Sequence, residues 1–184
     1  MYSNRKMKEI VYKTAELLSS ADNGTEITTR KIAENAGINP AMVNYYFGSK
    51  DNLLKAAVSA MEGDHSTDAA HDQDGSRKAM FDLLIKMCGT YILYSKLGLN
   101  SDTASFSKDV LEASSKLIEM KKVYSGTRSD EKGVESALKI VCFLMTASAN
   151  PEGFAKCSGI DVQSKNQLKL LVSKQLDILL GEAL

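Results

Sequence analysis

Proline and tryptophan are scarce in this chain, which has two prolines and no tryptophan in 184 residues. Because proline interrupts helices, its scarcity beside abundant Ala, Leu, Lys and Ser favours a helical protein. Neither charge is in excess, since 23 Lys and Arg balance 23 Asp and Glu, so the net charge indicates no polyanionic partner. The longest hydrophobic run, Ile140 to Met145, is too short to span a bilayer, and no signal peptide is recognisable. The sequence therefore predicts a cytoplasmic protein without a membrane partner.

Cysteine and histidine are too few and too widely spaced for a metal or redox centre. The chain has three cysteines, Cys88, Cys142 and Cys157. They form no Cys-x-x-Cys pair, and we interpret them as small buried hydrophobic residues. Both histidines lie in the acidic segment 62–74, where the spacing of His65 and His71 does not place them on one helix face. We therefore predict a solvated acidic linker, no metal site and no cofactor.

Apolar residues recur at helical spacing along most of the chain, and no convincing alternating strand pattern is present. The predicted helices span residues 4–20, 28–35, 40–47, 50–61, 77–97, 107–123, 130–149 and a last stretch from residue 164. Pro151 is expected to end the helix before it, because proline cannot continue a helix. Ser164 and Gln167 have the spacing of a capping box and predict the start of the last helix. Residues 62–76 are expected to form a loop or a frayed helix end. The predicted fold class is all-α.

Residues 27–47 carry the signals of two short helices joined by a tight turn. Ala33 is small where the first helix must approach the second, and Gly37 supplies the positive φ that the turn requires. Asn39 is a favoured N-cap, and Pro40 suits the first position of the second helix. This pattern predicts a helix-turn-helix, whose second helix can lie in the major groove of DNA. An ordinary helical hairpin that touches no DNA would fit the spacing as well.

Three consecutive aromatic residues, Tyr45, Tyr46 and Phe47, close the second helix and favour the DNA-binding interpretation. On so short a helix only one or two of the three can be buried. An exposed tyrosine hydroxyl near Lys50 is well suited to phosphate oxygens.

At this point the sequence resembles the TetR family of transcriptional regulators. The resemblance spans about residues 6–58 and rests on the following residues: Ile10, Leu17-Leu18, Thr28-Thr29, Ile32-Ala33, Ala36-Gly37-Ile38, Tyr46-Phe47, Ser49-Lys50 and Leu53-Leu54. It implies a three-helix DNA-binding head, residues 1–48, and a helical ligand-binding and dimerisation core, residues 49–184, with about nine helices in all. The core resembles the family only in its length and all-α character.

The resemblance implies that one set of side chains contacts DNA: Thr29, Arg30, Pro40, Ala41, Met42, Asn44, Tyr45, Tyr46 and Lys50. Thr29 and Lys50 would touch phosphates at the two edges of the motif, and Arg30 would reach a guanine or a phosphate. The residues that open the second helix would contact thymine methyl groups. Asn44 stands where the family often has tyrosine, and its amide could bond a base edge or a phosphate. Tyr45 and Tyr46 would contact the backbone, while Phe47 packs inside.

The resemblance also implies an inducer pocket and a dimer interface in the core. The candidate pocket residues are Met80, Phe81, Leu84, Met87, Tyr91, Tyr94, Leu111, Met120 and Phe143. The candidate interface residues are Val134, Leu138, Val141, Met145, Leu168, Leu171, Val172, Leu176 and Leu179. Both sets could equally be the plain hydrophobic core of the domain, because helical spacing predicts a buried face without identifying what covers it.

The sequence as a whole predicts a homodimeric DNA-binding regulator that recognises palindromic double-stranded DNA. We expect a repressor released by a small, largely apolar inducer, which favours a conformation of low DNA affinity. An activator or a DNA-organising protein without an inducer would use the same head and dimer. An enzyme is the weaker alternative, because the chain has two histidines, both in the acidic segment, and no Gly-rich phosphate loop.

Overall fold

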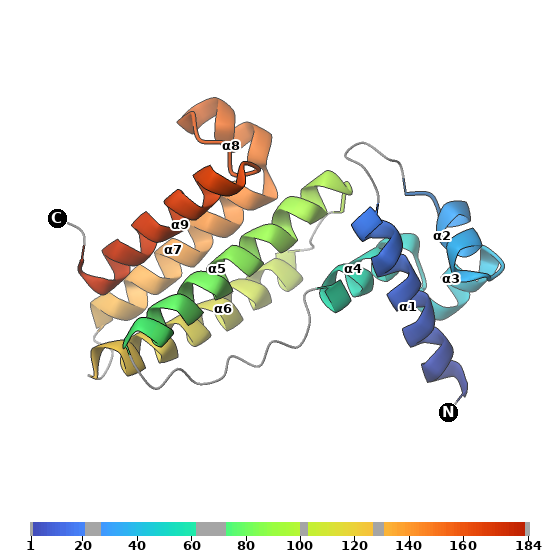
Figure 1. The fold of residues 1–184 in the computed structure, drawn as a ribbon, viewed down its shortest axis with the longest axis horizontal. Coiled ribbons are helices and arrows are strands. Elements are labelled where there is room, and N and C mark those ends of the chain that lie inside the picture. The colour runs from blue at the N-terminus through green and yellow to red at the C-terminus, as the bar shows by residue number, and fades with distance from the viewer. Residues whose placement is uncertain (1, 21–26, 62–72, 100–102, 127–130, 183–184) are drawn as a thin grey trace. The chain divides into compact units, whose positions relative to one another are not determined.

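The computed structural model describes residues 2–20, 27–61, 73–99, 103–126 and 131–182. All regular secondary structure in these ranges is α-helical (Figure 1). The helices are α1 (Tyr2–Ser20), α2 (Thr29–Ala36), α3 (Ala41–Phe47), α4 (Lys50–Met61), α5 (Gln73–Lys96), α6 (Thr103–Ser125), α7 (Glu131–Ala149), α8 (Pro151–Ser158) and α9 (Lys165–Leu180). The predicted all-α fold is confirmed. None of these helices is both long and apolar enough to cross a membrane.

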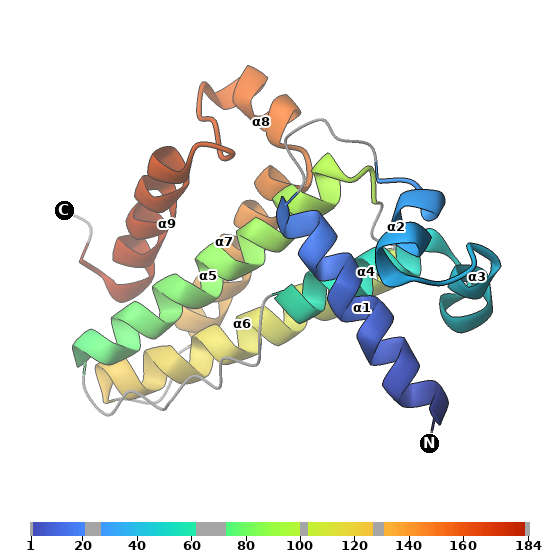
Figure 2. The same cartoon turned by 45° about the vertical axis from the view of Figure 1, so that its right-hand side comes forward.

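The chain divides into two compact units, Met1–Asp64 and His65–Leu184. The first unit, called the head from here on, contains α1 to α4. Helix α4 packs along α1 and against α3 (Figure 2), because its apolar face buries Leu53, Leu54, Ala57 and Val58. The head therefore includes α4, which lies beyond the predicted boundary after residue 48.

The second unit is a helical bundle in which α5, α6 and α7 pack against one another and α9 covers α5 and α7. Its fully buried side chains include Met80, Leu84, Leu117, Leu144, Met145 and Leu176. Helix α8 packs on α7 at one end of the bundle (Figure 1). Arg77 joins the first and last helices of the unit, since its guanidinium Nη2 lies 2.5 Å from Oδ1 of Asp177.

The sequence analysis missed α8 because it interpreted Pro151 only as the end of a helix. Pro151 instead occupies the first position of α8, where its missing N–H costs no hydrogen bond. Asn150 is the N-cap, and its Oδ1 accepts a hydrogen bond from the backbone N–H of Gly153 at 3.0 Å. The chain therefore ends one helix and begins the next within two residues.

Three further local predictions differ from the structure. The capping box at α9 is wrong: Ser164 is the N-cap but makes no side-chain cap bond, and Oε1 of Gln167 accepts from the backbone N–H of Asp161 instead. Helix α5 begins at Gln73, inside the segment predicted as a loop or frayed end. Only Cys88 is a buried thiol, because the positions of Cys142 on α7 and Cys157 on α8 face solvent.

Candidate nucleic-acid interface

The helix pair α2 and α3 is closed by a left-handed glycine turn. The hydroxyl of Thr28 accepts a hydrogen bond from the N–H of Lys31 and caps the start of α2. Gly37 ends α2 with φ 62° and ψ 40°, and the N–H of Ile38 bonds the carbonyl of Ala33 at 3.0 Å. A Cβ at Gly37 would meet no atom within 4 Å, so the backbone conformation alone requires glycine there. The predicted turn is confirmed.

The start of α3 is fixed by Asn39 and Pro40. Oδ1 of Asn39 accepts from the N–H of Ala41 at 2.9 Å, and Pro40 already has helical angles of φ −51° and ψ −33°. These two residues orient the first turn of α3, as the sequence predicted. At the other end, Nδ2 of Asn52 donates to the carbonyl of Phe47 at 2.9 Å and ties α3 to α4.

The inner and outer faces of the pair differ sharply in burial. Ile32, Ala33, Ala36 and Val43 are buried in the head. The outer surface of α3 exposes Ala41, Asn44 and Tyr45, and Tyr45 is 77% exposed. Met42, Tyr46 and Phe47 are half-buried, so Phe47 is only partly inside. The exposed surface of α3 is thus uncharged and combines one methyl group, one amide and one phenol.

Arg30 precedes α3 in the sequence and Lys50 follows it, and the two cations differ in their exposure and in their partners. Arg30 on α2 is 83% exposed, and its Nε forms an ion pair with Oε1 of Glu34 at 3.0 Å. Lys50 at the start of α4 is half-buried, and its Nζ donates to the carbonyl of Ile27 at 3.4 Å. Ile27 lies two residues before Thr29, so Lys50 and Thr29 lie at the same edge of the motif. This differs from the prediction that the two residues touch phosphates at the two edges of the motif.

Sequence reasoning missed two polar contacts that shape this region. It did not use the ion pair of Arg30 with Glu34, although a spacing of four residues on a helix is a readable signal. It also missed Asn35, whose Nδ2 donates to the carbonyl of Lys13 at 2.7 Å and joins α2 to α1. That contact spans distant parts of the chain and has no local signature.

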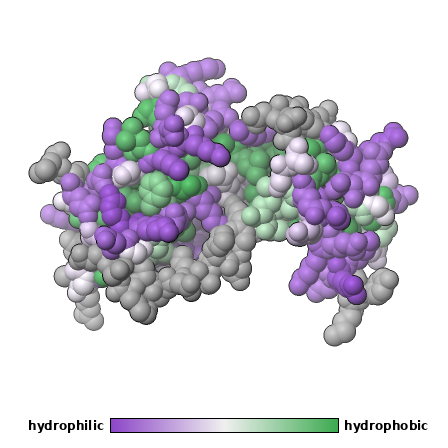
Figure 3. Space-filling view, viewed as in Figure 1, coloured by the Kyte–Doolittle hydropathy of each residue, from purple (hydrophilic) through white to green (hydrophobic). Residues whose placement is uncertain are grey.

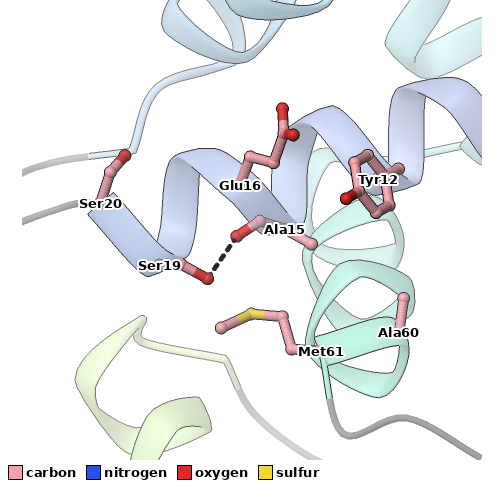
Figure 4. A pocket seen from close by; sticks show the side chains of 7 residues that line it. All are labelled: Tyr12, Ala15, Glu16, Ser19, Ser20, Ala60 and Met61. Carbon is pink, nitrogen blue, oxygen red and sulfur yellow. Dashed lines mark hydrogen bonds between the residues drawn. The ribbon is translucent and has the colours of Figure 1, made fainter.

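The head also carries an open hollow of about 550 Å³ between α1 and α4 (Figure 4). Its lining residues are Tyr12, Ala15, Glu16, Ser19, Ser20, Ala60 and Met61. None of them belongs to the predicted inducer pocket or to the predicted DNA contacts. Tyr12 and Met61 give it an apolar rim, and they are 64% and 40% exposed.

The candidate inducer-pocket residues do not form one enclosed group. Met80, Leu84, Met87 and Tyr91 are core residues of the second unit. Phe81 and Met120 are half-buried against that core. Tyr94 is half-buried, and its ring centroid lies 5.8 Å from that of Tyr91. Leu111 and Phe143 are 64% and 39% exposed, so they do not line an enclosed cavity within the described unit.

Most candidate dimer residues are already buried within a single copy of the chain. The members of the core are Val141, Met145, Leu168, Leu171, Val172, Leu176 and Leu179. Val134 and Leu138 are half-buried. The large apolar side chains that α9 exposes are instead Leu170 and Ile178, at 58% and 55%. The second unit shows hydrophobic patches among hydrophilic side chains on the face in Figure 3.

Metal-ligating side chains do not cluster in the part of the chain that the structure describes. No group of three His, Cys, Asp or Glu in these residues could hold a metal ion. Residues 62–72 of the acidic segment, which include both histidines, lie outside the described residues. The buried thiol of Cys88 has its pKa raised to about 11 by burial, which makes it a poor nucleophile near neutral pH.

The head is similar to a known protein family. Residues 14–57 match the family described as bacterial regulatory proteins, tetR family. The HTH-type transcriptional regulator BetI of Rhizobium meliloti (strain 1021) is 41% identical over 56 residues, which cover 30% of this chain and 28% of that protein. The HTH-type transcriptional dual regulator CecR of Shigella flexneri is 32% identical over 104 residues, a match that covers 51% of this chain and 45% of that protein. No solved structure matches. Each relative is thus matched over less than half of its own length, and the family match over residues 14–57 contains the whole α2–turn–α3 motif.

Proposed function

We propose that this protein is a sequence-specific, DNA-binding transcriptional regulator. The observation that carries the proposal is the α2–turn–α3 geometry, in which Gly37 and Asn39 fix the turn while α3 leaves its outer face uncovered. Such a helix fits the major groove with its first residues against base edges. Both relatives are named as HTH-type transcriptional regulators.

Base recognition is assigned to the outer face of α3 and to Arg30. Ala41 and Pro40 are small apolar groups that suit thymine methyls, and the amide of Asn44 can pair with adenine. Met42 is half-buried and offers only part of its side chain. Arg30 is the only cation among these base-facing candidates, and its guanidinium suits a guanine.

Phosphate contacts are assigned to the edge that Lys50 and Thr29 share. Lys50 brings a positive charge to the carbonyl of Ile27, directly before the N-terminus of α2. Backbone N–H groups at a helix N-terminus and the positive end of its dipole attract phosphate oxygens. The rings of Tyr45 and Tyr46 meet edge to face with their centroids 5.1 Å apart, and their hydroxyl groups supply donors at the end of α3.

Substitution of the two cations should separate base contacts from phosphate contacts. We expect Arg30→Ala to weaken binding to the preferred site by about 1–3 kcal/mol and to relax specificity there. Lys50→Gln should weaken binding to all sequences about equally. It should also lower the slope of log affinity against log salt concentration by about 1. Fluorescence anisotropy with preferred and scrambled duplexes over a range of salt measures both effects. Lys139→Gln, an exposed cation on α7, is the matched control. Wild-type affinities in both variants would contradict the assigned roles.

Selection of bound sequences from a random DNA pool, at two salt concentrations, tests the function itself. We expect an enriched palindrome whose half-sites are about one turn of DNA, ~34–36 Å, apart. Salt-dependent binding without a preferred sequence would instead support an architectural role. Absence of DNA binding by the full chain, after removal of co-purified small molecules by refolding, would contradict the proposal.

Recognition of a palindrome requires a homodimer, and we assign the dimer interface to α9. Leu170 and Ile178 are exposed on α9, whereas the neighbouring apolar residues of this helix belong to the core. Leu170→Glu with Ile178→Glu should weaken dimerisation by about 2 kcal/mol or more, roughly 30-fold, because the interface would bury two charges. Sedimentation equilibrium measures the change. The control is Val123→Glu, which charges an equally exposed apolar position on α6. An unchanged dimer would contradict this surface.

A repressor released by a small apolar inducer remains the form of regulation that we propose. A ligand seated against the methionine and tyrosine side chains of α5 would act through its different affinities for two conformations of the dimer. Activation would use the same contacts and would depend on where the DNA site lies relative to a promoter.

A further inference from the structure

The cation assigned to base recognition is already engaged by a carboxylate in the free protein. Arg30 and Glu34 lie one turn apart on α2, with Nε of Arg30 3.0 Å from Oε1 of Glu34. Both side chains are largely exposed, at 83% and 64%. An exposed pair of this kind adds little to stability. Its position is nevertheless costly for a DNA-binding surface, because Glu34 brings a negative charge towards a polyanion.

The geometry of the pair leaves part of the guanidinium available. Glu34 engages Nε, and among the described residues the two terminal nitrogens of Arg30, Nη1 and Nη2, have no ion-pair partner. A guanidinium can use these two nitrogens for a bidentate contact with O6 and N7 of guanine while Nε stays bound elsewhere. The carboxylate thus restricts the rotation of Arg30 without occupying its recognition edge.

We propose that Glu34 is a positioning and specificity-determining residue for Arg30, an inference that rests on the DNA-binding function proposed above. At the correct base pair, Arg30 keeps its bond to Glu34 and meets guanine through Nη1 and Nη2. On other DNA, phosphates must compete with Glu34 for the same cation and approach its negative charge. The carboxylate therefore disfavours incorrect sites more than the correct one, which is how a repulsive group increases specificity.

Removal of the negative charge tests this role. Glu34→Gln is expected to raise affinity for a scrambled duplex about three- to tenfold and to steepen the log–log salt dependence by ~0.9, because one more cation becomes free for phosphate. The ratio of specific to scrambled affinity should fall by a similar factor. Glu16→Gln is the control, since it removes one negative charge from an exposed ion pair on α1 of the same unit. That variant should leave the ratio unchanged.

A double-mutant cycle separates positioning from bare charge. In an Arg30→Ala background, Glu34→Gln should leave the specificity ratio unchanged, because the carboxylate has no guanidinium left to orient. An equal fall of the ratio with and without Arg30 would overturn the inference, as would a wild-type ratio and salt slope in Glu34→Gln. If the wild-type protein prefers no sequence at all, the proposed function fails. If it prefers a site and Glu34→Gln keeps that preference, only the present inference fails.

Discussion

Ile32→Ala should unfold the head while the second unit keeps its structure. Ile32 is 0% exposed, and the head has few other large buried residues, such as Ile10, Leu53 and Leu54. Removal of a buried isoleucine side chain beyond Cβ costs about 2–5 kcal/mol. A unit of about 60 residues has limited burial and small total stability, so this loss is a large part of it. DNA binding should be lost with the fold of the head.

Hydrogen exchange resolved by peptide measures the expected difference between the units. Amides of α1, α2 and α4 should lose protection, while amides of α5, α7 and α9 should keep it. Lys31→Ala changes the exposed neighbour on the same helix and should alter neither set. Equal loss of protection in both units would contradict the expectation, because it would mean that they unfold together.

The stability of the second unit should fall as pH rises from about 9 to about 11. Burial raises the pKa of Cys88 from 9.0 to about 11. Between these values the folded protein retains a proton that the unfolded chain has lost. The free energy of unfolding therefore decreases with pH in this window and is highest below it. A shift of two units corresponds to roughly 2–3 kcal/mol at most.

Urea unfolding of the wild type and Cys88→Ala at several pH values isolates this effect. Lysine and tyrosine titrations are common to both proteins, so they cancel in the difference between the two free energies of unfolding. The stability advantage of the wild type should shrink as pH rises. A difference that is constant across the window would contradict the buried-thiol origin. In the folded wild type, a thiol reagent should react quickly with Cys142 and Cys157 and only after unfolding with Cys88.

Local signals explain why the helix-turn-helix could be predicted from the sequence. Gly37, Asn39 and Pro40 determine the backbone within a few residues of themselves, and each has the conformation or bond that its side chain favours. The same type of signal failed at Pro151, because proline is compatible both with the residue after a helix and with the first residue of one. Only the cap bond of Asn150 distinguishes the two cases.

Tertiary partners could not be read from helical periodicity. The spacing of Leu168, Leu171, Val172 and Leu176 correctly predicted a buried face on α9, but the face is covered by α5 and α7 of the same chain. Leu170 does not belong to that face and is exposed. The orientation of Lys50 towards Ile27 also depends on how α4 packs in the head, and no local pattern specifies such packing.

The capped start of α8 restricts the order in which this stretch of sequence can change. A Cβ at Gly153 would lie 2.6 Å from Nδ2 and 2.8 Å from Oδ1 of Asn150, so any side chain there collides with the amide that caps the helix. Variation at position 153 must follow the loss or reorientation of Asn150, at the cost of the cap, about 1 kcal/mol. Among homologous chains, substitutions at position 150 should therefore precede substitutions at position 153, and the two positions should covary.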